Sequence, residues 1–468
     1  MTLIATSDRK VVIGLGATGQ SVVRFLLRQG SVPVVVDSRA QPPGLDRFRE
    51  MFPDVPVECG ALRRDTLLAA SEIVASPGIG LAEPAIAEAL AAGIPVVGDI
   101  ELFAREIAQR SPSPKVIGIT GSNGKSTVTT LLGLMAERAG VAVKVGGNIG
   151  VPVLDLLDQT LPELFVLELS SFQLETTYTL NLDAATILNI SADHMDRYPS
   201  LAAYHQAKQR IYRHAQQLVI NRADLLTRGP LARDRREWSF GQDKPDLQQF
   251  GVIQRDGAQW LARGAEALMP AWEMGMVGSH NVANALAALA LGCAVELPMP
   301  TMLDTLRSFS GLAHRCERVA DADGITYVND SKGTNVGATR AALDGLAEGS
   351  RKIVLIAGGD GKGADFAPLA EAADTLRGLV TIGVDGDKIA EVLGGKTDQC
   401  RAASMDEAVA RARAMAQPGD FVLLSPACAS FDMYRNFEAR GEDFRRAVAA
   451  TIGGKGQASS TRTTGGAS

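Results

Sequence analysis

The run Lys115-Val116-Ile117-Gly118-Ile119-Thr120-Gly121-Ser122-Asn123-Gly124-Lys125-Ser126-Thr127 carries the strongest structural signal in this chain. It predicts a buried strand, a glycine-rich turn and the start of a helix that continues through residues 128–139. Backbone N–H groups at such a helix start bind phosphate, the lysine adds a mobile positive charge, and the serine hydroxyl can ligate Mg²⁺. The standard P-loop has its first glycine where this chain has Ile119, so the loop that begins at Gly121 is shorter. We expect a phosphate site at this turn.

The segments that follow the turn predict more strands of the same sheet. Strand-like runs at residues 164–169, 184–190 and 217–221 alternate with helical ones, which is typical of a parallel α/β domain. Residues 232–273 are rich in hydropathy alternation and turn residues, and they predict small antiparallel strands. An Ala/Leu-rich stretch predicts a long helix over residues 281–297.

A second glycine-rich turn, Gly14-Leu15-Gly16-Ala17-Thr18-Gly19, follows the strand-like run 11–13. A helical pattern and another apolar run, 34–36, come next and lead into Asp37. This order of elements, with the acid about 20 residues after the last glycine, is the dinucleotide-binding fingerprint. The turn predicts a diphosphate ligand without identifying it, because Asp37 could hold the ribose of NAD or serve an unrelated ligand. Two phosphate loops indicate two nucleotide-like ligands, whereas a dehydrogenase needs one.

The last third of the chain predicts another parallel sheet. Its strands are expected at residues 326–329, 352–357, 378–382 and 420–424, with helices between them. Glycine-rich or polar segments follow three of these strands: Asn329–Asn335, Gly358–Gly363 and Ser425–Ser430. Because the glycines expose Lys362 at the carboxyl end of a strand, we expect an anion to bind in the crevice of this sheet.

The length of 468 residues is too great for one ordinary core and favours three domains. We expect an α/β protein with an N-terminal Rossmann-like parallel sheet, a central P-loop-type ATPase domain and a C-terminal Rossmann-like domain. The predicted ranges are 1–110, 111–310 and 311–452, and residues 453–468 are predicted to form a disordered tail because they are rich in Gly, Ser and Thr.

Composition excludes several classes of protein. A formal net charge of -6 and only 5% aromatic residues argue against a nucleic-acid-binding protein. No apolar stretch reaches the roughly 20 residues of a membrane span, and residues 1–10 lack the pattern of a secretory leader. The five cysteines are scattered and form no C-x-x-C pair, which is typical of thiols in a reducing compartment. We therefore expect a cytoplasmic protein without membrane insertion.

Two residues at predicted strand ends are candidate metal ligands. Glu168 closes a strand of the P-loop domain, where an acid can hold Mg²⁺ directly or through water. His194 follows another strand and lies between Asp193 and Asp196. The five histidines show no zinc-type spacing. By its spacing alone, Lys208 would pass as a solvated helix lysine.

Taken together, the motifs resemble those of the Mur ligase family, the ATP-dependent amide-forming enzymes of peptidoglycan synthesis. The resemblance runs from Val11 to about Ala449. The motifs that carry it are Gly121–Thr127, Glu168–Glu175, Asp193–Asp196, Gly278–Asn281, His314-Arg315, Asn329–Asn335, Gly358–Phe366 and Ser425–Phe437. The last segments are typical of the members that add D-glutamate.

The resemblance implies a ligase that joins D-glutamate to UDP-N-acetylmuramoyl-L-alanine through an acyl phosphate, with ADP and phosphate as products. It implies ATP and Mg²⁺ as cofactors, with two Mg²⁺ sites, and a monomeric enzyme whose third domain closes over the second. Lys208 matches the lysine that this family carbamylates, which would turn a cation into a carboxylate-like metal ligand.

The resemblance also assigns residues to ligands. UDP-sugar binding falls to Gly14, Gly16, Thr18, Gly19, Asp37, Ser38, Arg39, Ser76, Gly78 and Asn148. ATP binding falls to Gly121, Ser122, Asn123, Gly124, Lys125, Ser126, Thr127, Asn281, Asn284, Arg315 and Asp330. Glutamate binding falls to Thr334, Lys362, Ser430 and Phe437, and metal binding to Ser126, Glu168, His194 and carbamylated Lys208. The catalytic set is Lys125, His194, Lys208, Lys332 and Lys362.

Three other functions stay open at this point. A related ligase could add a different amino acid or act on folate. A non-catalytic nucleotide sensor could use the P-loop as a switch. An NAD oxidoreductase would explain the Gly14–Gly19 turn but not the Gly121–Thr127 turn.

Overall fold

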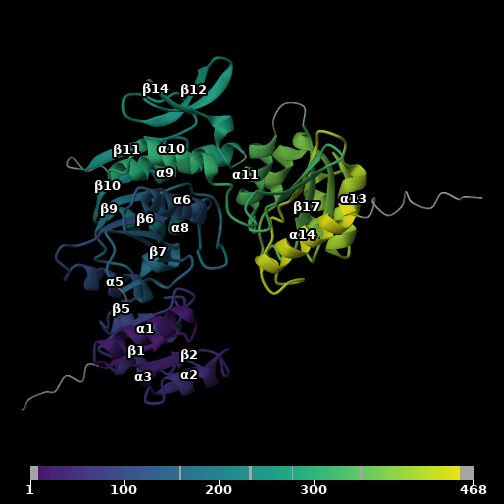
Figure 1. The fold of residues 1–468 in the computed structure, drawn as a ribbon. Helices are drawn as coiled ribbons and strands as arrows, with labels where there is room; N and C mark the ends of the chain where they lie inside the picture. Colours follow the sequence, from purple (N-terminus) through teal and green to yellow (C-terminus); the bar gives the residue numbers. More distant parts are fainter. Residues whose placement is uncertain (1–8, 158–159, 231–234, 277, 348–350, 454–468) are drawn as a thin grey trace, which may run out of the picture.

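The computed structural model describes residues 9–157, 160–230, 235–276, 278–347 and 351–453, and in that part of the chain it contains three β-sheets (Figure 1). Each sheet lies within one predicted domain range, and we name the three parts the N-terminal, central and C-terminal units. The predicted α/β class with three domains is confirmed, whereas the residue boundaries stay predictions. The predicted tail lies outside the described residues except for Gly453, which ends the last helix.

The N-terminal unit is a parallel sheet with helices on both faces. Its strands are β1 (Lys10–Ile13), β2 (Val34–Asp37), β3 (Val57–Cys59), β4 (Glu72–Ala75) and β5 (Val96–Val97), and its helices are α1 (Ala17–Arg28), α2 (Leu45–Met51), α3 (Arg64–Leu68), α4 (Pro84–Ala91) and α5 (Asp99–Ile107). The strand order is β3-β2-β1-β4-β5. The order of strand addition reverses between β1 and β4, and ligands of such sheets bind at the carboxyl ends of the strands there. The Gly14–Gly19 turn and Ser76 follow these two strands and border that crevice.

The central unit contains the largest sheet. Its strands are β6 (Lys115–Thr120), β7 (Val143–Gly147), β8 (Leu164–Glu168), β9 (Leu182–Ile187), β10 (Ala215–Asn221), β11 (Arg236–Phe240), β12 (Phe250–Arg255), β13 (Ala258–Arg263) and β14 (Glu266–Pro270). Its α-helices are α6 (Lys125–Arg138), α7 (Ser171–Glu175), α8 (Leu201–Gln209), α9 (Ser279–Ala294) and α10 (Met299–Ser308). The strand β6 lies between β8 and β9, so the phosphate loop after β6 has Glu168 on one side and the segment after β9 on the other.

The prediction of antiparallel strands over residues 232–273 is correct for β12, β13 and β14 and wrong for β11. The strands β12 to β14 pair antiparallel through tight turns. The strand β11 instead pairs parallel with β10, from Gln217 opposite Arg236 to Asn221 opposite Phe240. A parallel neighbour needs a crossover of about a dozen residues, and the chain between Asn221 and Arg236 is long enough to provide one.

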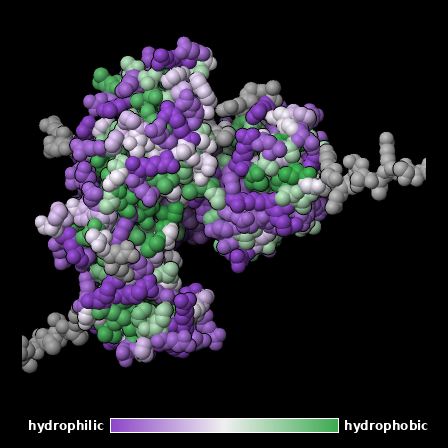
Figure 2. Space-filling model, viewed as in Figure 1, coloured by the Kyte–Doolittle hydropathy of each residue, from purple (hydrophilic) through white to green (hydrophobic). Residues whose placement is uncertain are grey.

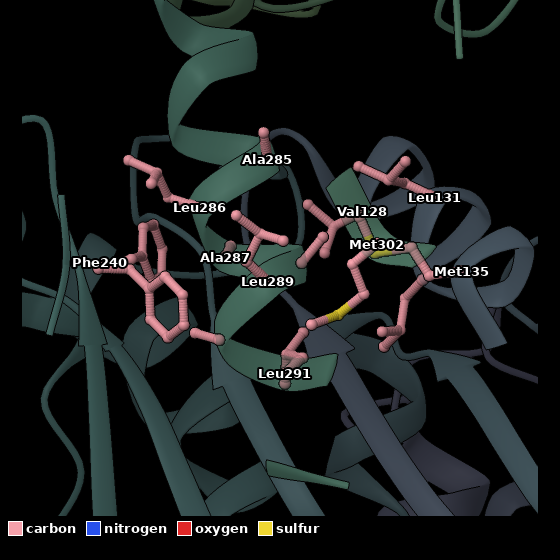
Figure 3. Packing of buried hydrophobic residues seen from close by; sticks show 14 of the residues in the cluster. Val128, Leu131, Met135, Phe240, Ala285, Leu286, Ala287, Leu289, Leu291 and Met302 are labelled. Carbon is pink, nitrogen blue, oxygen red and sulfur yellow. The ribbon is translucent and has the colours of Figure 1, made fainter. Parts of the chain in front are cut away.

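The core of the central unit is built around α9, which is apolar on nearly every face. Figure 3 shows Leu286, Leu289 and Leu291 of this helix packed against α6, α10 and β11, with Met135 and Met302 filling the space between helices. A helix that is hydrophobic all round is stable only when buried. Burial of α9 fixes its first two turns, which carry Asn281 and Asn284, beside the phosphate loop.

The C-terminal unit has helices on both faces of a mostly parallel sheet. Its strands are β15 (Glu317–Ala322), β16 (Ile325–Asn329), β17 (Ile353–Gly358), β18 (Leu376–Ile382), β19 (Asp398–Arg401) and β20 (Phe421–Leu424), and its α-helices are α11 (Val336–Leu346), α12 (Gly386–Leu393), α13 (Met405–Met415) and α14 (Phe437–Gly453). The strand order is β15-β16-β20-β17-β18-β19, with β15 antiparallel. The segments after β16, β17 and β20 therefore meet at one edge of the sheet.

The central unit lies between the other two. Figure 1 shows the N-terminal unit at one end of the central unit and the C-terminal unit beside it, with α11 on the side that faces the central unit. In the space-filling view of Figure 2, the C-terminal unit meets the central unit and leaves an open recess toward the N-terminal unit. Short 3-10 helices occur at Val153–Leu157, Arg210–Tyr212, Leu225–Thr227, Ala271–Glu273 and Ala367–Thr375. Within the described ranges, no helix combines the length and the apolar character that crossing a bilayer requires.

Candidate functional site

The phosphate loop begins α6 in the way that the sequence predicts. Gly124 precedes the helix with φ +84°, a left-handed conformation that favours glycine. The Lys125 ammonium donates hydrogen bonds to the carbonyl oxygens of Gly121 and Ser122, at 2.8 and 2.9 Å. Burial lowers the pKa of Lys125, while the charges of Glu168 and Asp193 oppose that effect. The loop therefore holds the Lys125 ammonium inside its own turn. A phosphate bound to the loop would pair with this positive charge.

Side chains from two neighbouring segments hold this loop. The Asn123 N–H donates to the side-chain Oδ1 of Asn189 at 2.8 Å, just after β9. The Arg315 guanidinium, which comes from the segment before β15, donates to the Ser126 hydroxyl at 2.7 Å. The start of α6 is thus contacted by residues far apart in the sequence, and one of them belongs to the C-terminal unit.

A cavity of about 360 Å³ extends from the loop into the junction of the central and C-terminal units. Most of the residues predicted to bind ATP line it: Asn123, Gly124, Thr127, Asn281, Asn284, Arg315 and Asp330. Lys332 and residues of α11 form part of the opposite wall. The volume lies within the range of small-molecule sites, and a helix start rich in N–H groups opens into it.

Asp330 is buried at the end of β16, inside this cavity wall. Its carboxylate accepts hydrogen bonds from the Ser425 hydroxyl at 2.7 Å and from the Cys316 N–H at 3.2 Å. Burial nevertheless raises the pKa of Asp330 to about 6. A carboxyl with this pKa can accept a hydrogen bond when ionised or donate one when protonated.

Glu168 has the surroundings of a cation ligand. It is buried at the end of β8, and Asn148 donates a hydrogen bond to its Oε1 at 2.7 Å. Its buried Oε2 has no hydrogen-bond partner among the described residues. The positive charges of Lys125 and Arg315 interact with it. An unpartnered carboxylate oxygen beside a phosphate loop fits Mg²⁺, which takes one or two carboxylates together with phosphate oxygens and water.

His194 follows β9 in a left-handed backbone conformation, with φ +57°. Its side chain is 45% exposed, and its Nε2 lies 3.8 Å from Asp193 Oδ2. The ring packs edge-on against Phe172, with 4.8 Å between the ring centroids. The described residues contain no group of three or more His, Cys, Asp or Glu side chains that could hold a metal ion. A cation bound to Glu168 and His194 would therefore need further ligands of another kind, such as phosphate oxygens and water.

Lys208 is not the solvated lysine that its spacing suggests, because it is 1% exposed inside the central unit. Its ammonium donates to the Thr120 hydroxyl at 3.2 Å and to the Gly121 carbonyl at 3.0 Å, and it lies 4.7 Å from the centre of the Tyr204 ring. Burial lowers its pKa well below the ordinary value, and the nearby charge of Lys125 adds to the effect. A lowered pKa makes the neutral amine more accessible, and the neutral amine is the nucleophilic form of lysine.

The crevice of the N-terminal sheet brings together most of the residues predicted to bind the UDP-sugar. The Asp37 carboxylate accepts hydrogen bonds from the Leu15 N–H at 2.9 Å and from the Arg39 side chain at 2.7 and 2.8 Å. These bonds with Arg39 lower the pKa of Asp37 to about 2. A Cβ on Gly19 would overlap the Gly14 carbonyl, so the turn requires glycine there. Ser76 faces the same turn.

The other predicted contacts of this ligand lie around the same crevice or at its far side. Gly16 and Thr18 lie in the turn and at the start of α1, Ser38 separates Asp37 from Arg39, and Gly78 lies in the segment after β4. Asn148 lies in the central unit, bound to Glu168. Arg197 of the central unit donates to the Pro77 carbonyl at 3.2 Å. The predicted set therefore spans the N-terminal and central units and ends at Glu168.

The residues predicted to bind glutamate lie at the edge of the C-terminal sheet. The Lys332 ammonium is 4.1 Å from the centre of the Phe437 ring, and burial lowers its pKa to about 8. Lys362 adopts φ +50° and faces the exposed ring of Phe431 at 5.6 Å. Ser430 is buried after β20, and Thr334 precedes the cap of α11.

Several polar residues with evident structural roles carry no signal in the sequence. Arg440 is buried and binds the Ser331 hydroxyl and carbonyl and the carbonyls of Cys428 and Ala429. Gln173 completes a capping box with Ser170 at the start of α7. An Arg in a helix or a Gln three residues after a Ser is too common to indicate such a role. A capping-box search would have found only the second.

Asp99 joins the N-terminal and central units through Gln173. The side-chain Oε1 of Gln173 accepts hydrogen bonds from Ser170, at 3.0 Å from its N–H and 3.2 Å from its hydroxyl. The Asp99 carboxylate accepts hydrogen bonds from the Gln173 side chain and from backbone N–H groups at the start of α5. Complete burial nevertheless raises the pKa of Asp99 to about 6.

We expect Asp99→Asn to change the pH dependence of stability. Because the folded protein favours protonated Asp99, the stability that this group provides is present below pH 3.8 and is lost as the pH rises toward 6. Relative to the variant, the parent should lose about 2 kcal/mol of unfolding free energy between pH 4 and pH 7. Urea unfolding at both pH values measures this difference. Exposed Asp256→Asn is the control, and identical pH profiles for Asp99→Asn and the parent would contradict the assignment.

Comparison with known families finds three matches along the chain. "Mur ligase MurD-like, N-terminal domain" matches residues 8–98, "Mur ligase middle domain" matches residues 119–292, and "Mur ligase, glutamate ligase domain" matches residues 314–428. Together they cover most of the chain, in the order of the three units.

Curated relatives are similar over nearly their whole length. The UDP-N-acetylmuramoylalanine–D-glutamate ligase of Pseudomonas aeruginosa is 52% identical over 96% of this chain and 99% of its own. The enzyme of that name from Marinobacter nauticus is 53% identical with the same coverage. Among solved structures, the MurF ligase of Thermotoga maritima in complex with ADP has a TM-score of 0.61 at 16% identity, covering 97% of this chain and 98% of its own. At that identity the structure supports the fold alone.

Proposed function

Because this chain belongs to the Mur ligase family, we propose that it is the ATP-dependent ligase that joins D-glutamate to UDP-N-acetylmuramoyl-L-alanine. One observation carries the proposal: the cavity at the phosphate loop has one wall from the central unit and one from the C-terminal unit. The C-terminal unit is the one that carries the residues predicted to bind the substrate D-glutamate. A ligase must bring nucleotide, acceptor and amine together, and this junction can do so.

The N-terminal unit binds the UDP part of the acceptor. We assign the diphosphate to the N–H groups at the start of α1, because the Leu15 N–H of the turn already donates to Asp37; Asp37 and Arg39 would provide polar contacts beside it. The sugar and its alanine then extend toward Asn148 and Glu168 in the central unit. This places the acceptor carboxylate near the phosphate loop.

The first chemical step activates that carboxylate. Its oxygen attacks the γ-phosphorus of ATP, the bond to the β-phosphate oxygen breaks, and ADP leaves an acyl phosphate behind. Lys125, Arg315 and the helix N–H groups stabilise the negative charge that gathers during the transfer. Glu168, His194 and Ser126 would hold Mg²⁺, which neutralises phosphate charge when bound. A second Mg²⁺ would need a further acidic ligand.

We propose that carbamylated Lys208 provides this further ligand. Neutral Lys208 can attack CO₂ through its nitrogen, and loss of a proton leaves a carbamate with a negative charge. The lowered pKa makes the neutral amine available, and the adjacent Lys125 offers a counter-charge. The carbamate would extend past Thr120 and Gly121 toward the phosphate loop.

The second chemical step forms the amide. The amine nitrogen of D-glutamate attacks the acyl carbon, a proton leaves the nitrogen, and phosphate departs. Lys362, Thr334, Ser430 and Phe437 surround the position predicted for the amino acid, and Lys332 faces both this position and the cavity. An acyl phosphate hydrolyses in open water, so we expect the C-terminal unit to close over the central unit during turnover.

The same proposal covers the organisation of the protein. We assign the acceptor to residues 1–110, ATP to residues 111–310 and glutamate to residues 311–452. We expect a monomer, as the resemblance to this family implies. We expect the reaction to take place in the cytoplasm, where ATP is available.

Phosphate release tests the proposal. The purified chain is incubated with ATP, Mg²⁺ and a panel of UDP-muramoyl acceptors and amino acids. We expect release only when UDP-N-acetylmuramoyl-L-alanine and D-glutamate are both present, with one phosphate per amide formed. Release that does not depend on D-glutamate would overturn the proposal, and tight ADP binding without turnover would instead favour a nucleotide sensor.

The lowered pKa of Lys332 predicts that ADP binding depends on pH. Burial and the nearby charges of Arg315 and Lys125 lower its pKa to about 8, so its positive charge is present at pH 7 and mostly lost at pH 9. If this charge contributes to phosphate binding, the Kd for ADP should rise by about tenfold between these pH values. Lys332→Arg should abolish that rise. Calorimetric titration with ADP measures both, and equal pH dependence in the two proteins would contradict the role.

A further inference from the structure

Asn335 links the C-terminal unit to the central unit through the two ends of one amide group. Its carbonyl oxygen accepts a hydrogen bond from the Ala338 N–H at 2.8 Å and so caps the start of α11. Its NH₂ group donates to Asp193 Oδ2 at 3.2 Å, in the segment that follows β9. Asparagine can do both because its side chain carries an acceptor and a donor. Aspartate and serine can also cap a helix, but neither offers the amide donor.

The Asp193 carboxylate lies between Asn335 and His194. Its Oδ1 accepts a hydrogen bond from the His194 N–H at 3.0 Å, and its Oδ2 lies 3.8 Å from His194 Nε2. The same oxygen, Oδ2, accepts the Asn335 hydrogen bond. The orientation of this carboxylate therefore depends on a residue of the C-terminal unit, while its effect falls on a predicted metal ligand of the central unit.

The backbone around this contact is also connected to the phosphate loop. The Ser191 N–H donates to the Ser122 hydroxyl at 2.9 Å, and that hydroxyl in turn donates to the Ser191 carbonyl at 3.0 Å. A Cβ on Gly337 would lie 2.8 Å from the Ser191 hydroxyl, so the first turn of α11 packs directly on this segment. Residues 191–194 are thus held between the phosphate loop and α11.

The backbone of His194 needs contacts that hold it in place, because its left-handed conformation is energetically unfavourable. A residue other than glycine in the left-handed region costs about 1 kcal/mol or more and persists only where its surroundings fix it. His194 adopts φ +57° and is 45% exposed, so packing alone does not fix the side chain. The ring contact with Phe172 fixes one face, and Asp193 is the polar group beside it.

We propose that Asn335 is a positioning residue for the ligation reaction: by orienting Asp193, it holds His194 and the adjoining segment in place only while the C-terminal unit is docked. Phosphoryl transfer would then be fast only when the C-terminal unit, which carries the amine substrate, is docked. This dependence would limit the formation of acyl phosphate that has no amine to react with. This inference rests on the proposed function for its catalytic consequence, whereas the placement of His194 is a property of the protein without ligands.

The experiment uses the full chain with two single substitutions of Asn335 and with one double substitution, called the exchange variant. Asn335→Ser keeps a helix cap but removes the donor to Asp193. Asn335→Asp keeps the cap and sets a carboxylate against Asp193. The double variant Asp193→Asn with Asn335→Asp exchanges donor and acceptor and re-forms the contact. Thermal unfolding confirms that each variant is folded, and ADP titration reports the phosphate loop separately.

The first readout needs no turnover. The chain has five histidines, so the imidazole signals of the ligand-free protein can be resolved by NMR, and a His194→Gln variant identifies the one required. We expect the His194 signal to move in both single variants and to return toward the parent position in the exchange variant. Unmoved signals of the other four histidines exclude a general rearrangement.

The second readout is the split between kcat and KM. We expect kcat to fall about tenfold in Asn335→Ser and about a hundredfold in Asn335→Asp, with the exchange variant recovering at least part of this loss. A merely structural effect on α11 would raise the KM for D-glutamate through Thr334 and leave the His194 signal in place. That result, or an exchange variant no better than Asn335→Asp in both readouts, would overturn the inference.

The two proposals fail in different ways. If the parent chain released no phosphate with D-glutamate, the proposed function would fall, while a moved His194 signal that the exchange restores would still support the contact. If the parent chain were active and Asn335→Ser kept both the parent kcat and the parent signal, the positioning role alone would fall.

Discussion

Replacement of Lys125 by methionine is expected to lower the rate of phosphate release by about a thousandfold while the protein remains folded. Methionine retains most of the apolar stem of lysine and removes the ammonium group, with its charge and its N–H donors. In the free protein the ammonium binds the carbonyls of Gly121 and Ser122, so its position at the loop is already fixed before a ligand arrives. A phosphate that enters the loop meets this charge without a cost of ordering the side chain.

The matched control for this variant is Lys115→Met. Lys115 begins the strand that leads into the loop, but its ammonium is about half exposed and pairs with Glu296 at the surface. A surface pair of this kind contributes about 1 kcal/mol at most, so the control should retain nearly full activity. Phosphate release with all substrates and ADP titration measure the two proteins. If Lys125→Met turned over at the parent rate, the assignment of the loop would be wrong.

The second large effect is expected at Lys208. Lys208→Met should lower kcat by about 10²–10³-fold, because loss of a carbamate would remove several kcal/mol of charge stabilisation from the phosphoryl transfer. Lys208→Arg keeps a positive charge but cannot form a carbamate, and it should be as inactive as the methionine variant. A requirement for positive charge alone would instead spare the arginine variant.

Carbamate formation can be observed directly. Incubation with ¹³C-bicarbonate should give a carbamate carbon signal in the parent protein that is absent from Lys208→Met. Lys144→Met is the control, since Lys144 binds the Leu156 carbonyl away from the phosphate loop. Equal signals in the parent and Lys208→Met would contradict carbamylation of this residue.

Much of the site follows from the sequence because strand ends in parallel sheets share an edge. The segments after β1, β6, β8 and β16 could each be recognised by a glycine-rich or polar pattern that follows an apolar run. Burial of each strand then brings these segments to the crevices where the structure has them. At these positions the local pattern identifies the segment, and the strand order of the sheet places it in the crevice.

The contacts between segments far apart in the sequence could not be predicted in this way. Asn335 is indistinguishable from an ordinary helix cap until its other amide end meets Asp193. Lys208 has the spacing of a surface lysine, and only the packing of the central unit makes it 1% exposed. The strand β11 has the alternation of a hairpin strand, and the length of the preceding connection decides its direction. Each of these depends on neighbours far away in the chain.

The position of Arg315 constrains how members of this family could exchange parts. Arg315 lies beyond residue 310 in the sequence, yet its guanidinium binds the hydroxyl of Ser126 in the phosphate loop. A recombination event that replaced the C-terminal unit would bring in a new amino-acid site and, with it, a new arginine for the nucleotide. Under the proposed roles, a chimera joined at the domain boundary would take its amino-acid site and this one nucleotide contact from one parent and its phosphate loop from the other.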